Sequence, residues 1–464
     1  MATSRNPGKP SSPCVIDRTS ALNALKKISS AAPIREIQRA LGSQAGLHLV
    51  GGTVRDALIG TTSQDIDLAA ALSAPEIAER LTAARIRVVE TGLKHGTVMA
   101  VFPEYNAEVT TFRAGRGGKP QLTIEDDLAG RDFTINALAY DLAQGKLIDP
   151  WQGAADLEQN YLRAVGRAAD RLNEDPLRLM RIFRFGPAWG RTIDPELMQA
   201  AKELAPRIQE ISPERVRVEL EKILVSARPA ETLRLMLQAG ILQHILPELM
   251  PGVGFEQNEF HIHDVFEHIL WVLERCRPDL TLRLTALFHD AGKPASFSVG
   301  DDGRRHFFKH ELISAEMSQT RMEALKFSND QVRDVATLVR YHMRPVSCGP
   351  AGARRLIRDL GPLFGLWREF KYADAPPVID DAAVHAELAK FDAMIAEEQA
   401  RLAKTGGFKL AINGDDLITL GVQPGVFLGS VLKSLEELVM DDPAKNTRED
   451  LLRAAGALID AKRV

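Results

Sequence analysis

The 464-residue chain is 45% apolar and 26% charged with a net charge of −4, which fits a soluble multi-domain protein and excludes a uniformly basic nucleic-acid-binding protein. Three widely separated cysteines, Cys14, Cys276 and Cys348, argue against a disulfide framework or a zinc knuckle and favour a reducing, cytoplasmic setting. The sequence has no run of 18 apolar residues and no signal-peptide pattern, so we expect no membrane association.

The first elements predict a tail followed by an α/β domain. Residues 1–20 are rich in Pro, Ser and Gly, which is typical of a flexible tail. Residues 20–45 predict a helix, and short β-prone and helical segments then alternate as far as residue 152. We therefore expect an α/β domain, here called the head, over 21–152, with a flexible polar loop at 113–127.

Two aspartates in "LVGGTVRDALIGTTSQDIDL" (49–68) predict a cation site. In a strand, Asp65 and Asp67 share one face while Ile66 points into the core, and their Cα atoms lie roughly 6.5–7 Å apart. Carboxylates placed this way repel each other unless a cation lies between them. Hard oxygen ligands of this kind favour Mg²⁺.

The surrounding residues predict a phosphate site beside the aspartates. Gly51 and Gly52 offer unblocked backbone N–H donors to phosphate oxygens, and Arg55 adds a charge-assisted fork. Glu108, in "AEVTTF", is positioned to supply a third carboxylate from a neighbouring strand. The alternative is an ordinary glycine turn followed by solvent-exposed acidic residues.

These residues, with "EDDLAGRDFTINALAYD" (125–141), resemble the class II nucleotidyltransferases, which include bacterial tRNA CCA-adding enzymes and poly(A) polymerases. The resemblance implies a head with the mixed sheet of the DNA polymerase β nucleotidyltransferase fold. It implies that Asp65 and Asp67 bind the catalytic magnesium ions, one activating the attacking 3′-hydroxyl and one neutralising the leaving pyrophosphate. It also implies that Gly52 and Arg55 hold the triphosphate.

The segment 131–141 reads by itself as the start of a helix with an apolar face. The resemblance instead implies nucleotide-binding roles for Arg131, Asp132 and Asn136, with Arg131 on the triphosphate. The family usually has two arginines before this aspartate. Gly130 stands at the first of those positions, so one contact of the family is not carried over.

Residues 153–250 predict a helical neck and body with a concentrated positive charge. Residues 161–194 contain seven arginines and four acidic residues, although the whole chain is acidic. Asp175 precedes a proline, and three arginines then follow at intervals of three, which predicts a basic ridge on one helix: Arg178, Arg181 and Arg184. The alternative for Asp175 is a simple helix cap.

A carboxylate and a guanidinium together match cytosine and adenine. Both bases present an exocyclic amine donor beside a ring-nitrogen acceptor, whereas uracil and guanine present the reverse pattern. The "EDxxR" motif of the family is believed to work this way, which implies that Asp175 and Arg178 read the base, with Arg181 and Arg184 near the base and phosphates. For the charges in 211–224 we favour a solvated helix face.

Residues 246–254 predict a hinge into an all-helical block over 251–375 that holds most of the histidines. Transition metals prefer mixed imidazole and carboxylate ligands, and this block offers five: His268, His289, Asp290, His310 and His342. The pattern resembles the HD superfamily of metal-dependent phosphohydrolases. His263 is a spare candidate, and Asp374 is a candidate for the last ligand. Lys309 replaces the glycine usual before the third histidine.

A helical tail is expected over 376–464, with a turn at 423–425. The sequence thus predicts an elongated multi-domain enzyme that adds C, C and A to the 3′ end of tRNA from CTP and ATP. We expect Mg²⁺ in the head, a second divalent metal in the HD domain and no obligate protein partner. The alternatives are a poly(A) polymerase of the same family and an HD phosphohydrolase with an RNA-binding head.

Overall fold

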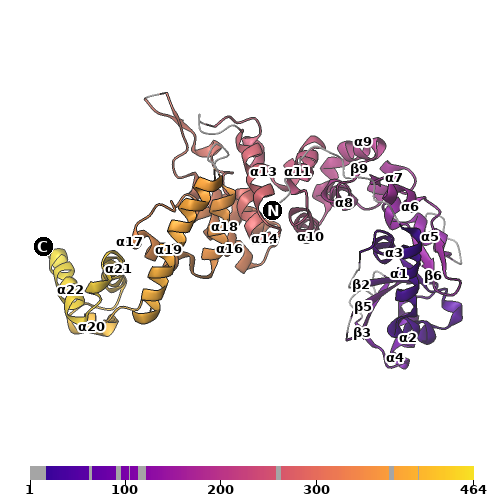
Figure 1. Cartoon of the computed structure of the whole chain (residues 1–464), viewed down its shortest axis with the longest axis horizontal. Coiled ribbons are helices and arrows are strands. Elements are labelled where there is room, and N and C mark those ends of the chain that lie inside the picture. The colour runs from indigo at the N-terminus through magenta and orange to yellow at the C-terminus, as the bar shows by residue number, and fades with distance from the viewer. Residues whose placement is uncertain are drawn as a thin grey trace. The chain divides into compact units, whose positions relative to one another are not determined.

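The chain forms two compact units, Met1–Pro247 and Glu248–Val464 (Figure 1). The computed structural model describes residues 17–61, 65–89, 96–103, 105–112, 122–257, 263–301, 303–375, 381–405 and 407–463. Within these ranges, no helix combines the length and the apolar composition that crossing a membrane requires. The expected tail lies mostly outside the described residues. Its residues 18–20 are helical, because Asp17 caps helix α1.

A seven-stranded mixed sheet forms the centre of the head, in the order β3-β4-β5-β2-β1-β6-β7. Strands β2 and β5 are parallel and their neighbours are antiparallel, which confirms the predicted fold class. The strands are β1 His48–Val50, β2 Asp65–Ala70, β3 Arg87–Val89, β4 Thr97–Val101, β5 Asn106–Thr111, β6 Ala139–Asp141 and β7 Lys146–Ile148.

Two helices pack directly on the sheet: α3 contacts β1, β2 and β6, and α4 contacts β3, β4 and β5. Helix α4 begins where Ser73 and Glu76 form a capping box. The helix expected within residues 20–45 is present as α2, and a second helix, α1, precedes it because the chain is extended at Ala31. The helices of the head are α1 Arg18–Ser30, α2 Ala32–Leu41, α3 Gly51–Leu58, α4 Ala74–Ala83 and α5 Ile124–Ala129.

Two local predictions in the head are wrong. Residues 131–141 do not start a helix: a short 3₁₀ turn, Thr134–Asn136, leads into strand β6, which pairs with β1. The pairing with β1 outweighs local helical preference. The expected loop 113–127 ends in helix α5, since Thr123 and Asp126 form a capping box, and residues 113–121 lie outside the described residues.

The neck and body complete the first unit and are helical except for one two-stranded sheet. The elements are α6 Gly153–Glu158, β8 Tyr161–Leu162, α7 Ala168–Glu174, α8 Arg178–Phe185, β9 Thr192–Ile193, α9 Pro195–Leu204, α10 Pro213–Leu224, α11 Pro229–Gln238 and α12 Leu242–Ile245. Helices α8 and α10 pack against each other. Their packing brings the charged faces of both helices to one side of the neck.

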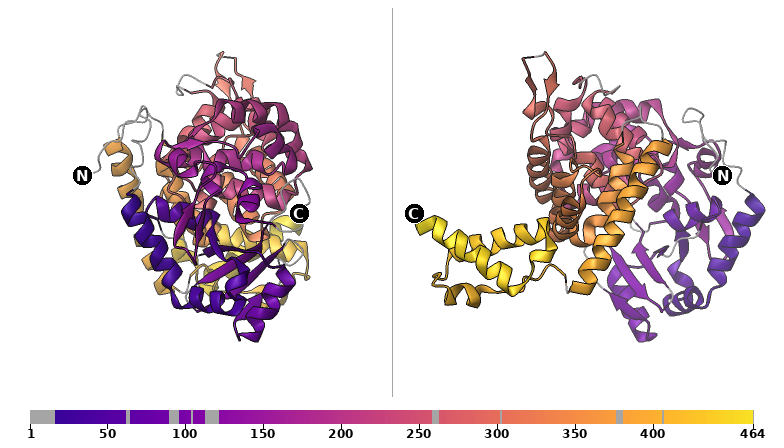
Figure 2. Two further views of the ribbon diagram at one scale, coloured as in Figure 1. Left: turned by 90° about the vertical axis from the view of Figure 1, so that its right-hand side faces the viewer. Right: turned by 60° about the vertical axis from the view of Figure 1, so that its left-hand side comes forward.

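The second unit contains the HD region and the carboxy-terminal helices, which run from orange to yellow in Figure 2. The elements are α13 Val265–Arg275, α14 Leu280–Phe288, β10 Ser298–Val299, β11 Arg305–His306, α15 His310–Ala324, α16 Asn329–Tyr341, α17 Pro350–Leu360, α18 Phe364–Ala373, α19 Asp381–Thr405, α20 Gly414–Thr419, α21 Val426–Asp441 and α22 Arg448–Arg463. Helices α20, α21 and α22 enclose a small apolar core of their own. Cys276 and Cys348 are free thiols, and Cys14 lies outside the described residues.

Candidate functional site

A polar cavity of about 740 Å³ lies between the head and the neck of the first unit. Its wall contains all thirteen residues that the sequence assigned to the nucleotide site: Gly51, Gly52, Arg55, Asp65, Asp67, Glu108, Arg131, Asp132, Asn136, Asp175, Arg178, Arg181 and Arg184. Residues from β2, β5, α3 and α8 therefore meet at one place. The role of each residue stays a prediction.

Three carboxylates line the sheet side of this cavity. Asp65 and Asp67 alternate with buried Ile66 along β2, and Glu108 on the parallel strand β5 lies in register with Asp67. Burial raises the pKa of the Asp67 carboxyl, although Arg131 and Arg55 lower it in part. All three side chains offer carboxylate oxygens, which are the ligands that Mg²⁺ prefers. The three carboxylates line one cavity. Among the described residues, the groups of three ligand atoms that lie within 4.8 Å of one another are in the second unit.

The amino terminus of helix α3 is directed at Asp67. Backbone N–H groups of Thr53 and Gly52 donate to its carboxylate, and the Thr53 hydroxyl accepts from the Asp67 backbone at 2.7 Å. A Cβ atom on Gly52 would lie 2.9 Å from Asp67 Oδ2. Gly51 adopts a φ of +57° and leaves room for the Arg131 guanidinium. The Gly52 donor that the sequence assigned to phosphate thus serves Asp67 in this structure.

Two arginines of the phosphate side are held by protein groups. Arg55 Nη1 donates to Asn136 Oδ1 at 2.7 Å, and its guanidinium lies 4.9 Å from the ring centre of Trp189. Arg131 pairs with buried Asp127 at 3.0 Å and donates to the Asn136 carbonyl. These contacts fix both guanidinium groups at the cavity wall before any ligand binds.

Asp132 accepts hydrogen bonds from three protein residues. Its Oδ1 accepts from Asn136 Nδ2 at 3.0 Å and from the Phe133 N–H at 2.8 Å, and its Oδ2 accepts from Arg181 Nε at 2.6 Å. Burial would raise the pKa of the Asp132 carboxyl, but Arg181 and Asn136 outweigh it and lower that pKa to about 2. A carboxylate with these bonds serves to hold Arg181 in place.

The predicted base-reading pair lies at the neck side of the cavity. Asp175 accepts from the Leu177 N–H at 3.1 Å and from Arg215 Nη2 at 3.0 Å. Arg178 donates to Glu174 at 2.9 Å and to the Gly130 carbonyl at 3.1 Å. A guanidinium has five N–H donors, so these bonds fix the plane of Arg178 and leave donors for a base.

Helix α10 adds charged residues that the sequence interpretation placed on a solvated face. Arg215 and Lys222 are exposed, as expected, whereas Glu219 is buried, so the interpretation is wrong for Glu219. Arg215 and Lys222 line the cavity, and Glu219 is buried between Arg184 and Arg181. Their spacing of four and three residues puts them on one helix face. The α8 arginines, spaced three residues apart, also share one face, and α8 and α10 pack against each other.

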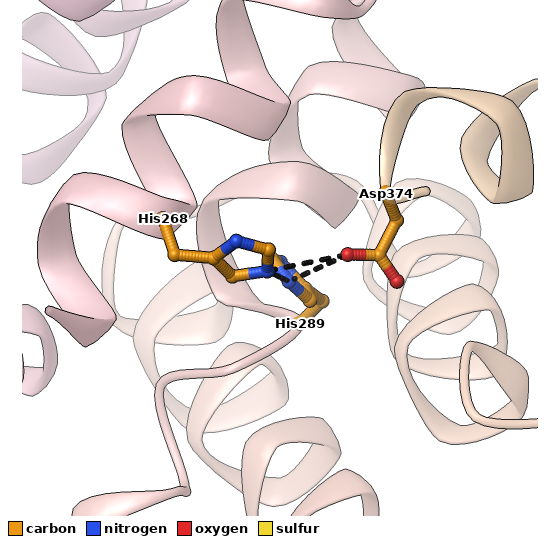
Figure 3. A group of neighbouring side chains, drawn as sticks. All are labelled: His268, His289 and Asp374. Atoms are coloured by element: carbon orange, nitrogen blue, oxygen red, sulfur yellow. Dashed lines mark hydrogen bonds and ion pairs between the residues drawn. The ribbon is translucent and has the colours of Figure 1, made fainter. Parts of the chain in front are cut away.

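A second cluster of polar side chains lies within the second unit. Two groups of ligand atoms each lie within 4.8 Å of one another: His268, His289 and Asp374, and Asp290, His310 and His342. Figure 3 shows the first group, with both imidazoles beside the Asp374 carboxylate. The five predicted ligands come together, Asp374 joins them, and His263 belongs to neither group.

Asp290 links the two groups. Its Oδ2 lies 3.3 Å from His268 Nε2 and 3.2 Å from His289 Nε2, while its Oδ1 lies 3.1 Å from His310 Nε2. The buried Lys293 ammonium contacts the same carboxylate at 2.7 Å. One carboxylate therefore faces both sets of imidazoles.

The histidine rings are oriented for metal binding. His289, His310 and His342 each place Nδ1 within 2.7–2.8 Å of the backbone carbonyl three residues earlier. Donation from Nδ1 leaves the Nε2 lone pair facing the cluster. Burial lowers the pKa of His289, but Asp290 and Asp374 outweigh it and raise that pKa to about 10. The carboxylates of Asp290 and Asp374 thus place negative charge beside the imidazoles, which suits a bound cation.

A second cavity adjoins this cluster. Its volume is about 520 Å³, and it includes the cationic side chains Lys293, Arg305 and Lys371. Lys309, which replaces the usual glycine, adopts a φ of +60° immediately before His310. That left-handed backbone explains why glycine is favoured there.

Three protein-family models match the chain. A "Poly A polymerase head domain" matches residues 47–163, and a "Probable RNA and SrmB- binding site of polymerase A" matches residues 190–252. An "HD domain" matches residues 265–359. The head-domain match contains the carboxylates of the first cavity, and the HD-domain match contains the histidines of the second cluster.

Curated proteins and solved structures resemble the chain over most of its length. An A-adding tRNA nucleotidyltransferase of Deinococcus radiodurans is 34% identical and covers 84% of this chain and 91% of its own. A CCA-adding enzyme of Latilactobacillus sakei is 32% identical and covers 92% and 98%. The Bacillus stearothermophilus CCA-adding enzyme crystallised with CTP shares the fold, with a TM-score of 0.63, 24% identity and coverage of 93% and 98%.

Proposed function

The chain belongs to the tRNA nucleotidyltransferase family that contains the CCA-adding and A-adding enzymes, and on this premise we propose that it adds C, C and A to the 3′ end of tRNA from CTP and ATP. One observation carries the proposal: the carboxylates of the head sheet and the Asp175–Arg178 pair of the neck line the same cavity. The carboxylates supply the reaction chemistry, and the pair supplies a choice of base without a nucleic-acid template.

Each wall of the cavity has a distinct task in this proposal. Asp175 accepts a hydrogen bond from the exocyclic amine of cytosine or adenine, while Arg178 donates to the adjacent ring nitrogen. Arg55 and Arg131 pair with the triphosphate. Asp65, Asp67 and Glu108 would hold Mg²⁺, which supplies positive charge to the reacting phosphate and the attacking 3′-hydroxyl. The products are RNA longer by one nucleotide and pyrophosphate.

The test uses three tRNA transcripts, ending at the discriminator base, after one C and after two C. Each is incubated with Mg²⁺ and CTP, ATP or both. Full CCA addition supports the proposal. Addition of a single A to the transcript that already carries two C would assign the activity of the A-adding relative. Long A tracts on any RNA would assign a poly(A) polymerase.

The reaction should depend on the head carboxylates and on the base reader in different ways. Asp67→Asn is expected to abolish all addition, because it removes a predicted metal ligand without changing side-chain size. Asp175→Ala is expected to leave a slow enzyme that incorporates U and G, with cognate selectivity lower by roughly one to two decades, since an unpaired base edge costs about 1–3 kcal/mol. Full fidelity in Asp175→Ala would refute the base-reading role.

The cluster in the second unit favours a second activity, metal-dependent hydrolysis of a phosphate ester. Its six candidate ligands lie close together, and the adjacent cavity also contains Lys293, Arg305 and Lys371. The test is hydrolysis of bis-p-nitrophenyl phosphate with Mn²⁺, Ni²⁺ or Mg²⁺, comparing the native chain with His289→Ala. Hydrolysis that survives in His289→Ala would remove this cluster as its source.

A further inference from the structure

Glu219 is a buried acid between two arginines of the nucleotide cavity. Its side chain is 5% exposed, its Oε2 lies 3.0 Å from Arg184 Nε, and its Oε1 lies 4.0 Å from Arg181 Nη1. A buried carboxylate is costly unless it is paired, so Glu219 is held there by these two cations. Both cations line the cavity.

The contact between Glu219 and Arg184 is an ion pair rather than a hydrogen bond. Among the described residues, neither Arg184 Nε nor Glu219 Oε2 has a hydrogen-bond partner. Arg184 also lies over the Phe185 ring, 4.1 Å from its centre. The guanidinium is therefore held from two sides, by charge and by an aromatic face, while its hydrogen-bond donors are not consumed by Glu219.

A continuous series of polar contacts leads from Glu219 to the phosphate side of the cavity. Arg181 contacts Glu219 on one side and donates to Asp132 on the other. Asn136 donates to Asp132 and accepts from Arg55. Glu219 thus stands at the neck end of a network that continues into the head, all within the first unit.

We propose that Glu219 is a positioning residue of the nucleotide site, which orients Arg181 and Arg184 toward the bound nucleotide. This inference depends on the proposed nucleotide transfer at the same cavity. Glu219 does not touch the reacting atoms. It acts by fixing two guanidinium groups whose flexible side chains otherwise sample many rotamers.

The decisive variant is Glu219→Gln, which keeps the shape and removes the charge. The KM for CTP and for ATP should rise about tenfold, because Arg181 and Arg184 lose their fixed orientation. The kcat should change by less than about threefold, because the carboxylates of the head sheet are unchanged. Glu219→Asp keeps the charge and should recover most of the loss. Glu221→Gln, on the same helix and paired with Arg217, is the matched control and should behave as the native chain.

Two results would overturn the proposal. A fall in KM would mean that Glu219 only masks positive charge, since its removal would then strengthen attraction of the triphosphate. A lower unfolding temperature with unchanged KM would mean that Glu219 only supports folding. If the native chain adds no nucleotide, titration calorimetry with CTP replaces the kinetics. Equal CTP affinity in native chain and Glu219→Gln would then refute the inference, independently of the reaction.

Discussion

At the scale of single residues, the absence of one side chain sets the distance between helix α3 and the site carboxylates. Gly52 has no Cβ atom, and the added atom would lie 2.9 Å from Asp67 Oδ2. Asp67 receives its hydrogen bonds from this same turn. Close approach, rather than an unusual backbone angle, is therefore the reason for glycine at this position.

We predict that Gly52→Ala lowers the rate of nucleotide addition about 100-fold, because the Asp67 carboxylate must move by several tenths of an ångström or more. The unfolding temperature should change little. Gly365→Ala is the control, since nothing lies within 4 Å of its added Cβ atom. Steady-state addition kinetics and thermal unfolding measure both effects. A fully active Gly52→Ala would show that Asp67 tolerates displacement.

The Asp132–Arg181 pair gives the first unit a specific pH dependence. The folded-state pKa of Asp132 is about 2, below its unfolded value of about 3.9. A depressed carboxyl pKa contributes stability that is present above the unfolded pKa and is lost as the pH falls through the folded pKa. The window therefore lies between about pH 4 and pH 2, and the contribution at pH 7 is about 2–3 kcal/mol.

Asp132→Asn should lose this contribution. We expect its free energy of unfolding to be lower than that of the native chain by about 2–3 kcal/mol at pH 7, with the difference shrinking as the pH falls toward 2. Urea unfolding at several pH values measures it. Asp170→Asn, at an exposed ion pair with Arg167, should change stability by less than about 0.5 kcal/mol. A pH-independent difference would assign the loss to packing instead.

The sequence located the residues that carry the site's chemistry but not all of those that support them. Asp65 and Asp67 were recognisable because a strand places both on one face and their charges need a cation. Glu219 was not, because a charged helix face looks the same whether solvent or another helix faces it. Only the packing of α10 on α8 distinguishes the two cases.

At the scale of elements, long-range pairing explains where sequence interpretation succeeded and failed. The alternating segments of the head gave the strands of the sheet, since alternation itself encodes one buried face. Strand β6 was mistaken for a helix start because its three residues are too few to show alternation, and its partner β1 lies about ninety residues earlier in the chain. The pairing Leu49 to Tyr140 decides the structure of this segment.

One buried arginine ties the carboxy-terminal helices to the HD region. Arg354 on α17 is 4% exposed, donates to the Met440 and Asp441 carbonyls at the end of α21, and pairs with Glu398 on α19 at 2.9 Å. The last carbonyls of a helix have no partner within the helix. Arg354 satisfies two of them.

We predict that Arg354→Ala destabilises the second unit by about 3–5 kcal/mol, because the buried Glu398 carboxylate loses its shorter ion pair and two carbonyls lose their donor. Limited proteolysis should then cleave faster around α20–α22. Arg453→Ala, at an exposed site on α22, is the control and should change stability by less than about 0.5 kcal/mol. Equal proteolysis of the two variants would show that the α20–α22 core docks without Arg354.

At the scale of the whole molecule, each compact unit contains its own candidate ligand site. We predict two calorimetric unfolding transitions. Mg²⁺ with CTP should raise one transition, and a transition metal such as Mn²⁺ should raise the other. A ligand at 100 times its Kd adds about 2.7 kcal/mol, which raises the unfolding temperature of a unit this size by about 5–11 °C.

Variants assign the two transitions. His289→Gln should abolish the Mn²⁺ shift and keep the shift with CTP, whereas Asp67→Asn should do the reverse. His385→Gln, a histidine of α19 outside both ligand groups, should keep both shifts. If His289→Gln retained the Mn²⁺ shift, the metal would bind elsewhere.

The separation of the lining residues has a consequence for the history of such chains. The wall of the first cavity uses residues between Val50 and Lys222, and that of the second uses residues between His268 and Leu388. Among the described residues, the lining of each cavity comes from one unit. Inactivating substitutions in one cavity are thus free to accumulate while the other stays under selection, so a lineage can discard either chemistry and keep its counterpart intact.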